Sequence, residues 1–150
     1  TKSYYNETKS LKSYEIKEFS FLYILLTKPD LICQNLHLIE NVKLYSDENK
    51  QLYEEILGQS NNLSNQDFQK LDVDKNLINR VMNYASVKHI ISKNFDDDEK
   101  ILEIFTEIIQ DLKNYELEQR ISDLESKFSQ DLSEDTFNQL KELKKLQKIN

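Results

Sequence analysis

The sequence predicts an all-α fold in which a helical bundle is followed by a long connecting helix and a C-terminal helical hairpin. Three observations lead to this prediction. The 150 residues include one glycine and one proline, too few for the turns of an all-β fold or for a glycine-rich phosphate loop. Apolar residues recur at helical spacing through most of the chain. One long helical segment also changes its apolar face midway.

The composition excludes several classes of protein. Hydrophobic residues make up 38% of the chain and charged residues 31%, which is typical of a folded globular domain. The most apolar run, Phe19–Leu26, is far shorter than the roughly 20 residues that span a bilayer. The single cysteine, Cys33, can neither close an internal disulfide nor build a cysteine-rich zinc site. No signal-peptide pattern opens the chain, and we expect a cytoplasmic protein without membrane contact.

The net charge and the start of the chain add two further expectations. A net charge of −7 argues against nonspecific nucleic-acid binding, which depends on Lys and Arg neutralising phosphates. We therefore expect this chain to make no direct contact with nucleic acid. The chain begins at Thr1 without Met and opens on a polar stretch. This suggests a piece of a longer protein, although removal of an initiator Met would leave the same start.

Residues 1–13 have no sustained periodicity and are expected to form a tail or linker. Residues 14–112 are expected to form the bundle. Gly58 is expected to end one of its helices in the left-handed conformation. The pattern of residues 87–95 does not decide between helix and loop. The first expected helix of the bundle spans about Tyr14–Thr27, and a second begins at Pro29. A third spans about Asp47–Leu57, with Ser46 as its cap. A short helix with Phe68 and Leu71 follows a Ser64-x-x-Asp67 capping box, and the last spans about Asp74–Ser86.

The most informative segment is a long helix expected at about Asp97–Phe128. Its first apolar seam contains Ile101, Phe105, Ile108, Leu112 and Tyr115, and its second contains Leu117, Ile121, Leu124 and Phe128. At about 100° per residue the two seams lie on opposite faces of the helix. No proline or glycine interrupts the segment between Tyr115 and Leu117. One continuous helix is therefore expected to serve two hydrophobic cores.

The second core can be completed only by the end of the chain, so residues 113–150 are expected to form a helical hairpin. Ser133 is the expected cap of a last helix at about Glu134–Ile149. A two-helix hairpin has little interior and leaves apolar side chains exposed, which usually marks a partner site. A protruding hairpin could also exchange between protomers and give a swapped dimer. The apolar positions of the last helix are Phe137, Leu140, Leu143, Leu146 and Ile149.

A search for residues that carry chemistry predicts no catalytic, cofactor-binding or metal-binding site, and no cofactor. His37 and Glu40 are three residues apart, but in the reverse order of the Glu-x-x-His motif of di-metal bundles. Cys33 is one helical turn from His37, a common chance spacing. The acidic run at residues 96–99 suits a helix start. The lysines of the last helix complement the helix dipole or contact an acidic partner; they are Lys141, Lys144, Lys145 and Lys148.

Three segments carry a resemblance to a known family. The first is FLYILLTKPDLI, an apolar helix followed by a proline and an acidic residue. The second is LYSDENKQLYEEIL, an aromatic residue followed by a capped helix. The third is the terminal ISDLESKFSQDLSEDTFNQLKELKKLQKIN. Over about residues 15–150 the chain resembles the C-terminal, helicase-binding domain of bacterial replicative DNA primase. It departs from the usual family pattern in its Lys-, Asn- and Ile-rich composition, and in having Tyr45 where Phe is common.

The resemblance implies a non-catalytic fragment of a primase, since the zinc-ribbon and polymerase parts are absent. Its implied partner is the N-terminal domain of the hexameric replicative helicase, which the bundle can stimulate and to which the hairpin supplies most of the affinity. The expected apolar contacts are Leu140, Leu143, Leu146 and Ile149, and the expected polar contacts are Lys144, Lys145 and Lys148. The alternatives are the N-terminal domain of the helicase itself, a stand-alone helical adaptor, and a small helical enzyme.

Overall fold

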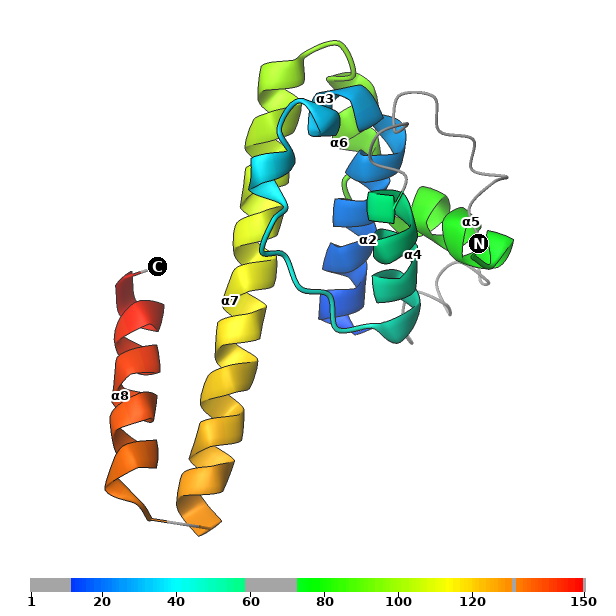
Figure 1. Cartoon of the computed structure of the whole chain (residues 1–150). Helices are drawn as coiled ribbons and strands as arrows, with labels where there is room; N and C mark the ends of the chain where they lie inside the picture. Colours follow the sequence, from blue (N-terminus) through cyan, green and yellow to red (C-terminus); the bar gives the residue numbers. More distant parts are fainter. Residues whose placement is uncertain (1–11, 59–72, 131, 150) are drawn as a thin grey trace.

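The computed structural model describes residues 12–58, 73–130 and 132–149, and these form helices without a strand. The predicted all-α class is confirmed. A bundle of shorter helices packs against the upper part of one long helix, and a last helix runs back beside its lower part (Figure 1). The elements are α2 (Ser13–Thr27), α3 (Pro29–Cys33), the 3₁₀ turn η1 (Leu36–Leu38), α4 (Asp47–Gly58), α5 (Lys75–Tyr84), α6 (Lys88–Lys93), α7 (Asp98–Gln130) and α8 (Glu134–Ile149).

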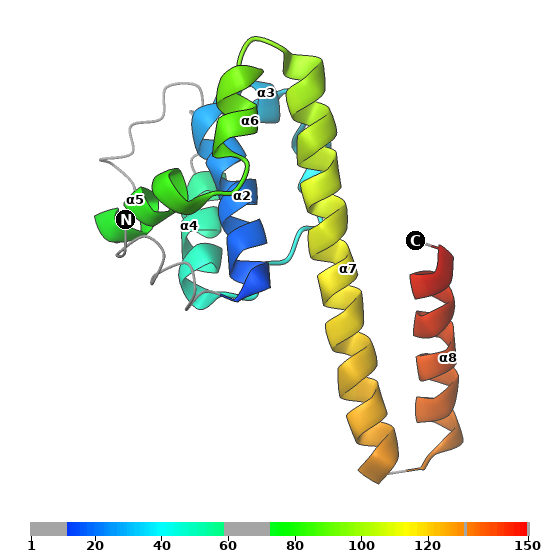
Figure 2. The ribbon, with the colours of Figure 1, turned by 180° about the vertical axis from the view of Figure 1, so that it is seen from behind.

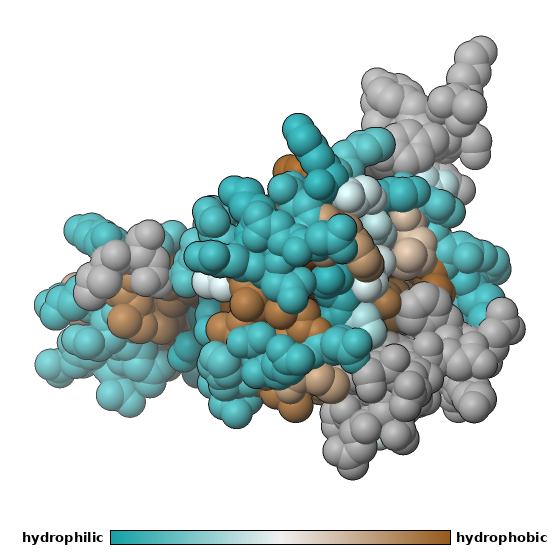
Figure 3. All heavy atoms as spheres, turned by 90° about the horizontal axis from the view of Figure 1, so that it is seen from above, coloured by the Kyte–Doolittle hydropathy of each residue, from teal (hydrophilic) through white to brown (hydrophobic). Residues whose placement is uncertain are grey.

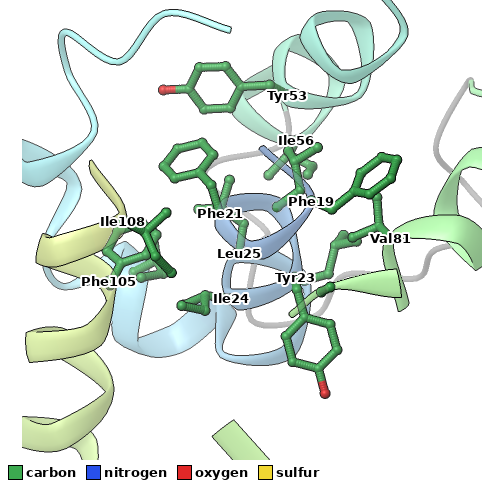
Figure 4. Close-up of a cluster of buried hydrophobic side chains, with 14 of the residues drawn as sticks. Phe19, Phe21, Tyr23, Ile24, Leu25, Tyr53, Ile56, Val81, Phe105 and Ile108 are labelled. Carbon is green, nitrogen blue, oxygen red and sulfur yellow. The ribbon is translucent and has the colours of Figure 1, made fainter. Parts of the chain in front are cut away.

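Helix α2 is the centre of the bundle, and every residue from Glu18 to Leu26 is buried. Phe21 lies between two neighbouring helices, with its ring centroid 5.3 Å from that of Tyr53 on α4 and 5.4 Å from that of Phe105 on α7. On another side of α2, Phe19 points toward α4 and α5 (Figure 4). A helix that is apolar almost all round is stable only when other helices cover it. Helices α3 to α7 provide that cover.

The expected helix bounds agree with the structure at most ends and differ at two. The helix that begins at Pro29 stops at Cys33 and is followed by a separate 3₁₀ turn. Gly58 is the last residue of α4 and does not have the expected positive φ. The ambiguous residues 87–95 contain the short helix α6. The tail at 1–11 and the capping box at Ser64-x-x-Asp67, with its short helix, lie outside the described residues.

The buried carboxyl group of Glu18 joins α2 to the start of α4. Its side chain is 1% exposed and accepts hydrogen bonds from the backbone N–H groups of Tyr45, at 2.5 Å, and Ser46, at 3.2 Å. It also accepts one from Nδ2 of Asn49, at 3.0 Å. Burial raises the pKa of Glu18, and the three hydrogen bonds oppose that rise. An acceptor at a helix N-terminus satisfies N–H groups that have no partner within the helix.

The first residues of α7 are held by the end of α2. The ammonium of Lys28 lies 3.1 Å from the carboxylate of Asp98 and donates a hydrogen bond of 2.9 Å to the carbonyl of Phe95. The same ammonium lies 4.3 Å from the centre of the Phe95 ring. These contacts fix the point at which the long helix begins.

Helix α7 is continuous through its change of apolar face, as the sequence predicts. The bundle lies on one side of α7 and α8 on the other, in the front view and in the view from behind (Figures 1 and 2). The buried residues form two separate clusters along this helix. The large one extends to Leu112 on α7, and the small one contains Ile121, Leu140 and Leu143.

Most of the coloured surface seen from above is hydrophilic, with smaller apolar areas between the hydrophilic ones (Figure 3). None of the helices in the described part of the chain is both long and apolar enough to cross a membrane.

Replacing Glu18 by Gln tests its role in capping α4. At mildly acidic pH the hydroxyl oxygen of the protonated Glu18 can still accept a hydrogen bond from an N–H group, whereas the NH₂ group of Gln cannot. Glu18→Gln should therefore lower the free energy of unfolding by about 1–3 kcal/mol at mildly acidic pH. Because the pKa of Glu18 is raised in the folded chain, its contribution is largest below the unfolded pKa and declines as the pH rises through the folded one. The difference between the two proteins should therefore shrink toward neutral pH. Urea denaturation at several pH values measures it, and a constant difference would contradict the assignment.

Truncation after Glu116 tests whether the large cluster is stable without the hairpin. The cut retains every α7 residue of the large cluster and also Tyr115. The shortened chain should still unfold in one cooperative transition, measured by circular dichroism on heating. A non-cooperative melt would mean that the two clusters depend on each other for folding.

Candidate protein-docking surface on the hairpin

The lower half of α7 and the antiparallel α8 pair through a small apolar interior. Ile121, Leu140 and Leu143 are buried there, and Leu117 and Leu124 are partly buried beside them. Ser133 caps α8 as predicted, because its Oγ accepts a hydrogen bond from the backbone N–H of Thr136 at 3.2 Å. An interior of so few side chains leaves most of the hairpin surface in contact with solvent.

The two leucines predicted as partner contacts belong to this interior. Leu140 is 8% exposed and Leu143 is 7% exposed. With α8 packed on α7, these side chains hold the hairpin together and are not presented to a partner. Their assignment as direct contacts stays a prediction that would require the hairpin to open.

One side of α8 forms a basic flank, which we define as Phe137, Lys141, Lys144 and Lys148. These positions recur three and four residues apart and so share one face of the helix. Phe137 is 45% exposed although it is large and apolar. Its ring centroid lies 5.8 Å from that of Phe128 on α7, and the ammonium of Lys141 lies 5.6 Å from its centre. The ammonium of Lys144 pairs with Glu125 at 3.0 Å. The flank therefore combines an apolar ring with three cations.

The remaining predicted contacts lie at several places around α8. Lys145 is exposed and lies 3.6 Å from Glu142 on the same helix. Lys148 is exposed in the last turn. Leu146 is 51% exposed and lines a hollow away from the basic flank. Ile149 is the last residue of α8, and its side chain lies outside the described part.

The opposite side of the hairpin is hollowed into a groove, which we call the hairpin groove. Its lower hollow of about 380 Å³ is lined by Arg120 and Leu124 from α7 and by Asp135, Glu142 and Leu143 from α8, together with the side-chain amides of Asn138 and Gln139. An upper hollow of about 470 Å³ also contains Arg120 and reaches Lys113, Glu116, Leu117 and Leu146, with Asn41 from the bundle at its border. The sequence prediction of the site did not include this groove. The seven-residue spacing of Asp135 and Glu142, which places both on one face of α8, is the signal that could have indicated it.

Three tyrosines pack together where the hairpin leaves the bundle. The ring of Tyr115 on α7 stacks on Tyr14 of α2, with 5.0 Å between centroids, and meets the ring of Tyr45 edge-on at 5.1 Å. Burial, followed by nearby charged groups, raises the pKa of each of the three hydroxyls. Offset-stacked and edge-to-face rings attract each other, so these contacts hold α7 in a fixed orientation against the bundle.

The candidates for metal or nucleophilic chemistry are not gathered into a site. His37 and His89 are exposed, and Cys33 is half-buried. Residues 96–99 are exposed and include the last two residues before α7 and its first two. Within residues 12–58, 73–130 and 132–149, no group of three or more His, Cys, Asp or Glu side chains could hold a metal ion.

The fold and this surface define an all-α chain in which the lower half of a long helix and the last helix form a hairpin that projects from a bundle. Comparison with known proteins gives no match, whether to a protein-family model, to a curated protein or to a solved structure.

Replacing Leu143 by Asp tests the role of the small interior. A charge buried between α7 and α8 without a partner is costly, and the interior has few other contacts to offset it. We expect Leu143→Asp to release α8 while the bundle stays folded. Hydrogen exchange measured by mass spectrometry should show loss of protection in α8 alone. Leu146→Asp, measured at a protein concentration at which the chain is monomeric, is the matched control, because Leu146 is half exposed in the single chain and its replacement should leave α8 protected. If α8 stays as protected in Leu143→Asp as in Leu146→Asp, Leu143 does not hold the hairpin closed.

Proposed function

We propose that this chain is the helicase-docking domain of a bacterial replicative primase. Its partner is the N-terminal domain of the hexameric replicative helicase, and docking brings the primase to the moving replication fork. Two features support the proposal. Three sequence segments resemble that family, and the order of a bundle, a long helix and a terminal hairpin is the order that the resemblance implies.

The observation that carries the docking role is the basic flank on a hairpin that projects away from the bundle. A half-exposed aromatic ring with lysines around it fits a protein interface, where an aromatic anchor supplies affinity and surrounding charges select and attract the partner. A chain with a net charge of −7 that nevertheless gathers Lys141, Lys144 and Lys148 on one face fits a partner with an acidic surface at that place.

In this proposal the domain performs no chemistry of its own. The zinc ribbon and the polymerase core would belong to other parts of the parent primase. The bundle would act on the bound helicase to stimulate it, and the hairpin would supply most of the affinity.

Charge reversal at the basic flank tests the proposal. Lys148→Glu should slow association with the helicase N-terminal domain, lower the affinity by up to about tenfold at low salt, and reduce its salt dependence. Phe137→Ala should speed dissociation, because it removes an apolar anchor. Surface plasmon resonance at low and moderate salt separates the two effects.

Lys93→Glu is the matched control, since Lys93 is an exposed lysine in the last turn of α6 on the bundle. It makes the same change of charge away from the flank and should leave binding unchanged. If wild type does not bind the helicase domain, the proposed function is wrong. If both flank variants bind as wild type does, the docking surface lies elsewhere.

A further inference from the structure

We propose that the hairpin groove is the binding face for a second copy of this chain, so that two hairpins form a four-helix bundle. The groove lies on a different side of α8 from the basic flank, and the inference does not depend on the proposed helicase docking.

The two walls of the groove carry opposite charge. The α7 wall has Lys113 and Arg120 with one carboxylate, Glu116, whereas the charged residues of the α8 wall are Asp135 and Glu142. A single helix with a stripe of one charge would be attracted by one wall and repelled by the other. A second copy of the same hairpin brings one wall of each sign and can satisfy both.

A two-fold axis parallel to the helices places these walls correctly. Helices α7 and α8 are antiparallel (Figure 1), and such an axis sets each α7 against the α8 of the second copy, again antiparallel. The axis also preserves the level of each residue along the hairpin. Arg120 and Glu142 line the same hollow, so Arg120 of each copy would meet Glu142 of the other. Closed two-fold pairing of this kind is the commonest symmetry of soluble oligomers.

The apolar side chains that line the groove would be buried by this pairing. Leu124 and Leu143 are among the residues that line the lower hollow, and Leu117 and Leu146 line the upper one. Leu146 is 51% exposed in the single chain and would become covered in the pair. Removing such apolar surface from water favours association.

The position of the bundle permits this approach. The bundle and α8 lie on opposite sides of α7 in both views (Figures 1 and 2). In the pair, the two-fold axis would place each bundle beside its own α7, on the side away from its own α8. Because Asn41 borders the upper hollow, the contact would be centred on the lower hollow around Arg120.

Complementary charge reversals test the pairing in the full chain. Arg120→Glu and Glu142→Arg should each weaken self-association, measured by sedimentation equilibrium, by at least about tenfold, because each places like charges at both symmetry-related contacts. An equimolar mixture of the two variants should associate as wild type does, since both contacts between positions 120 and 142 of a mixed dimer again join one arginine to one glutamate. Lys148→Glu, on the basic flank, is the control and should not change self-association.

Leu146→Asp separates this pairing from an exchange of α8 between copies. In an exchanged dimer α8 would pack on the other α7 as it packs on its own here, and Leu146 would stay exposed. Leu146→Asp should therefore weaken a groove dimer and leave an exchanged dimer intact. Wild type that is monomeric at every concentration, a mixture that fails to associate, or unchanged association of Leu146→Asp would each overturn the proposal. Helicase binding by Arg120→Glu should remain at the wild-type level, so the two proposals can fail separately.

Discussion

The whole architecture depends on one constraint, which is that α7 is an unbroken helix whose two apolar seams lie on opposite faces. The upper seam is covered by α2 and the lower one by α8. If both seams shared a face, α8 would compete with the bundle for one side of the helix. Because they do not, α8 must pack on the far side, and its pairing with only one helix exposes Phe137 and opens the hairpin groove.

The hairpin consequently carries two surfaces of different character. On one side Lys144 pairs with Glu125 across the two helices, and the remaining lysines and Phe137 face solvent. On the other side Arg120, two acidic residues of α8 and the leucines Leu124 and Leu143 line one hollow. A chain that uses the first side for one partner therefore leaves the second side uncovered.

Local sequence signals predicted the fold well. The bounds of α7 and α8 follow from periodicity and from Ser133, since these depend on residues close together in the chain. Glu18 was not predicted as a cap, because the backbone groups that it binds lie 27 and 28 residues away. The site was harder to predict for a related reason. Periodicity shows that Phe137 and Leu143 are apolar positions of one helix. Only the placement of α7 decides that Leu143 is covered and Phe137 is exposed. The prediction of a left-handed Gly58 was wrong because α4 continues through that residue.

The tyrosine cluster has a mechanical consequence for the end of the molecule. An α-helix rises about 1.5 Å per residue, so the tip of the hairpin at Gln130 lies roughly 22 Å beyond Tyr115. A bend of about 10° in α7 at Tyr115 would therefore displace the tip by about 4 Å. The packing of these three rings therefore affects the direction in which the hairpin projects from the bundle. The affinity of any partner that contacts both the bundle and the hairpin would therefore depend on the angle between them.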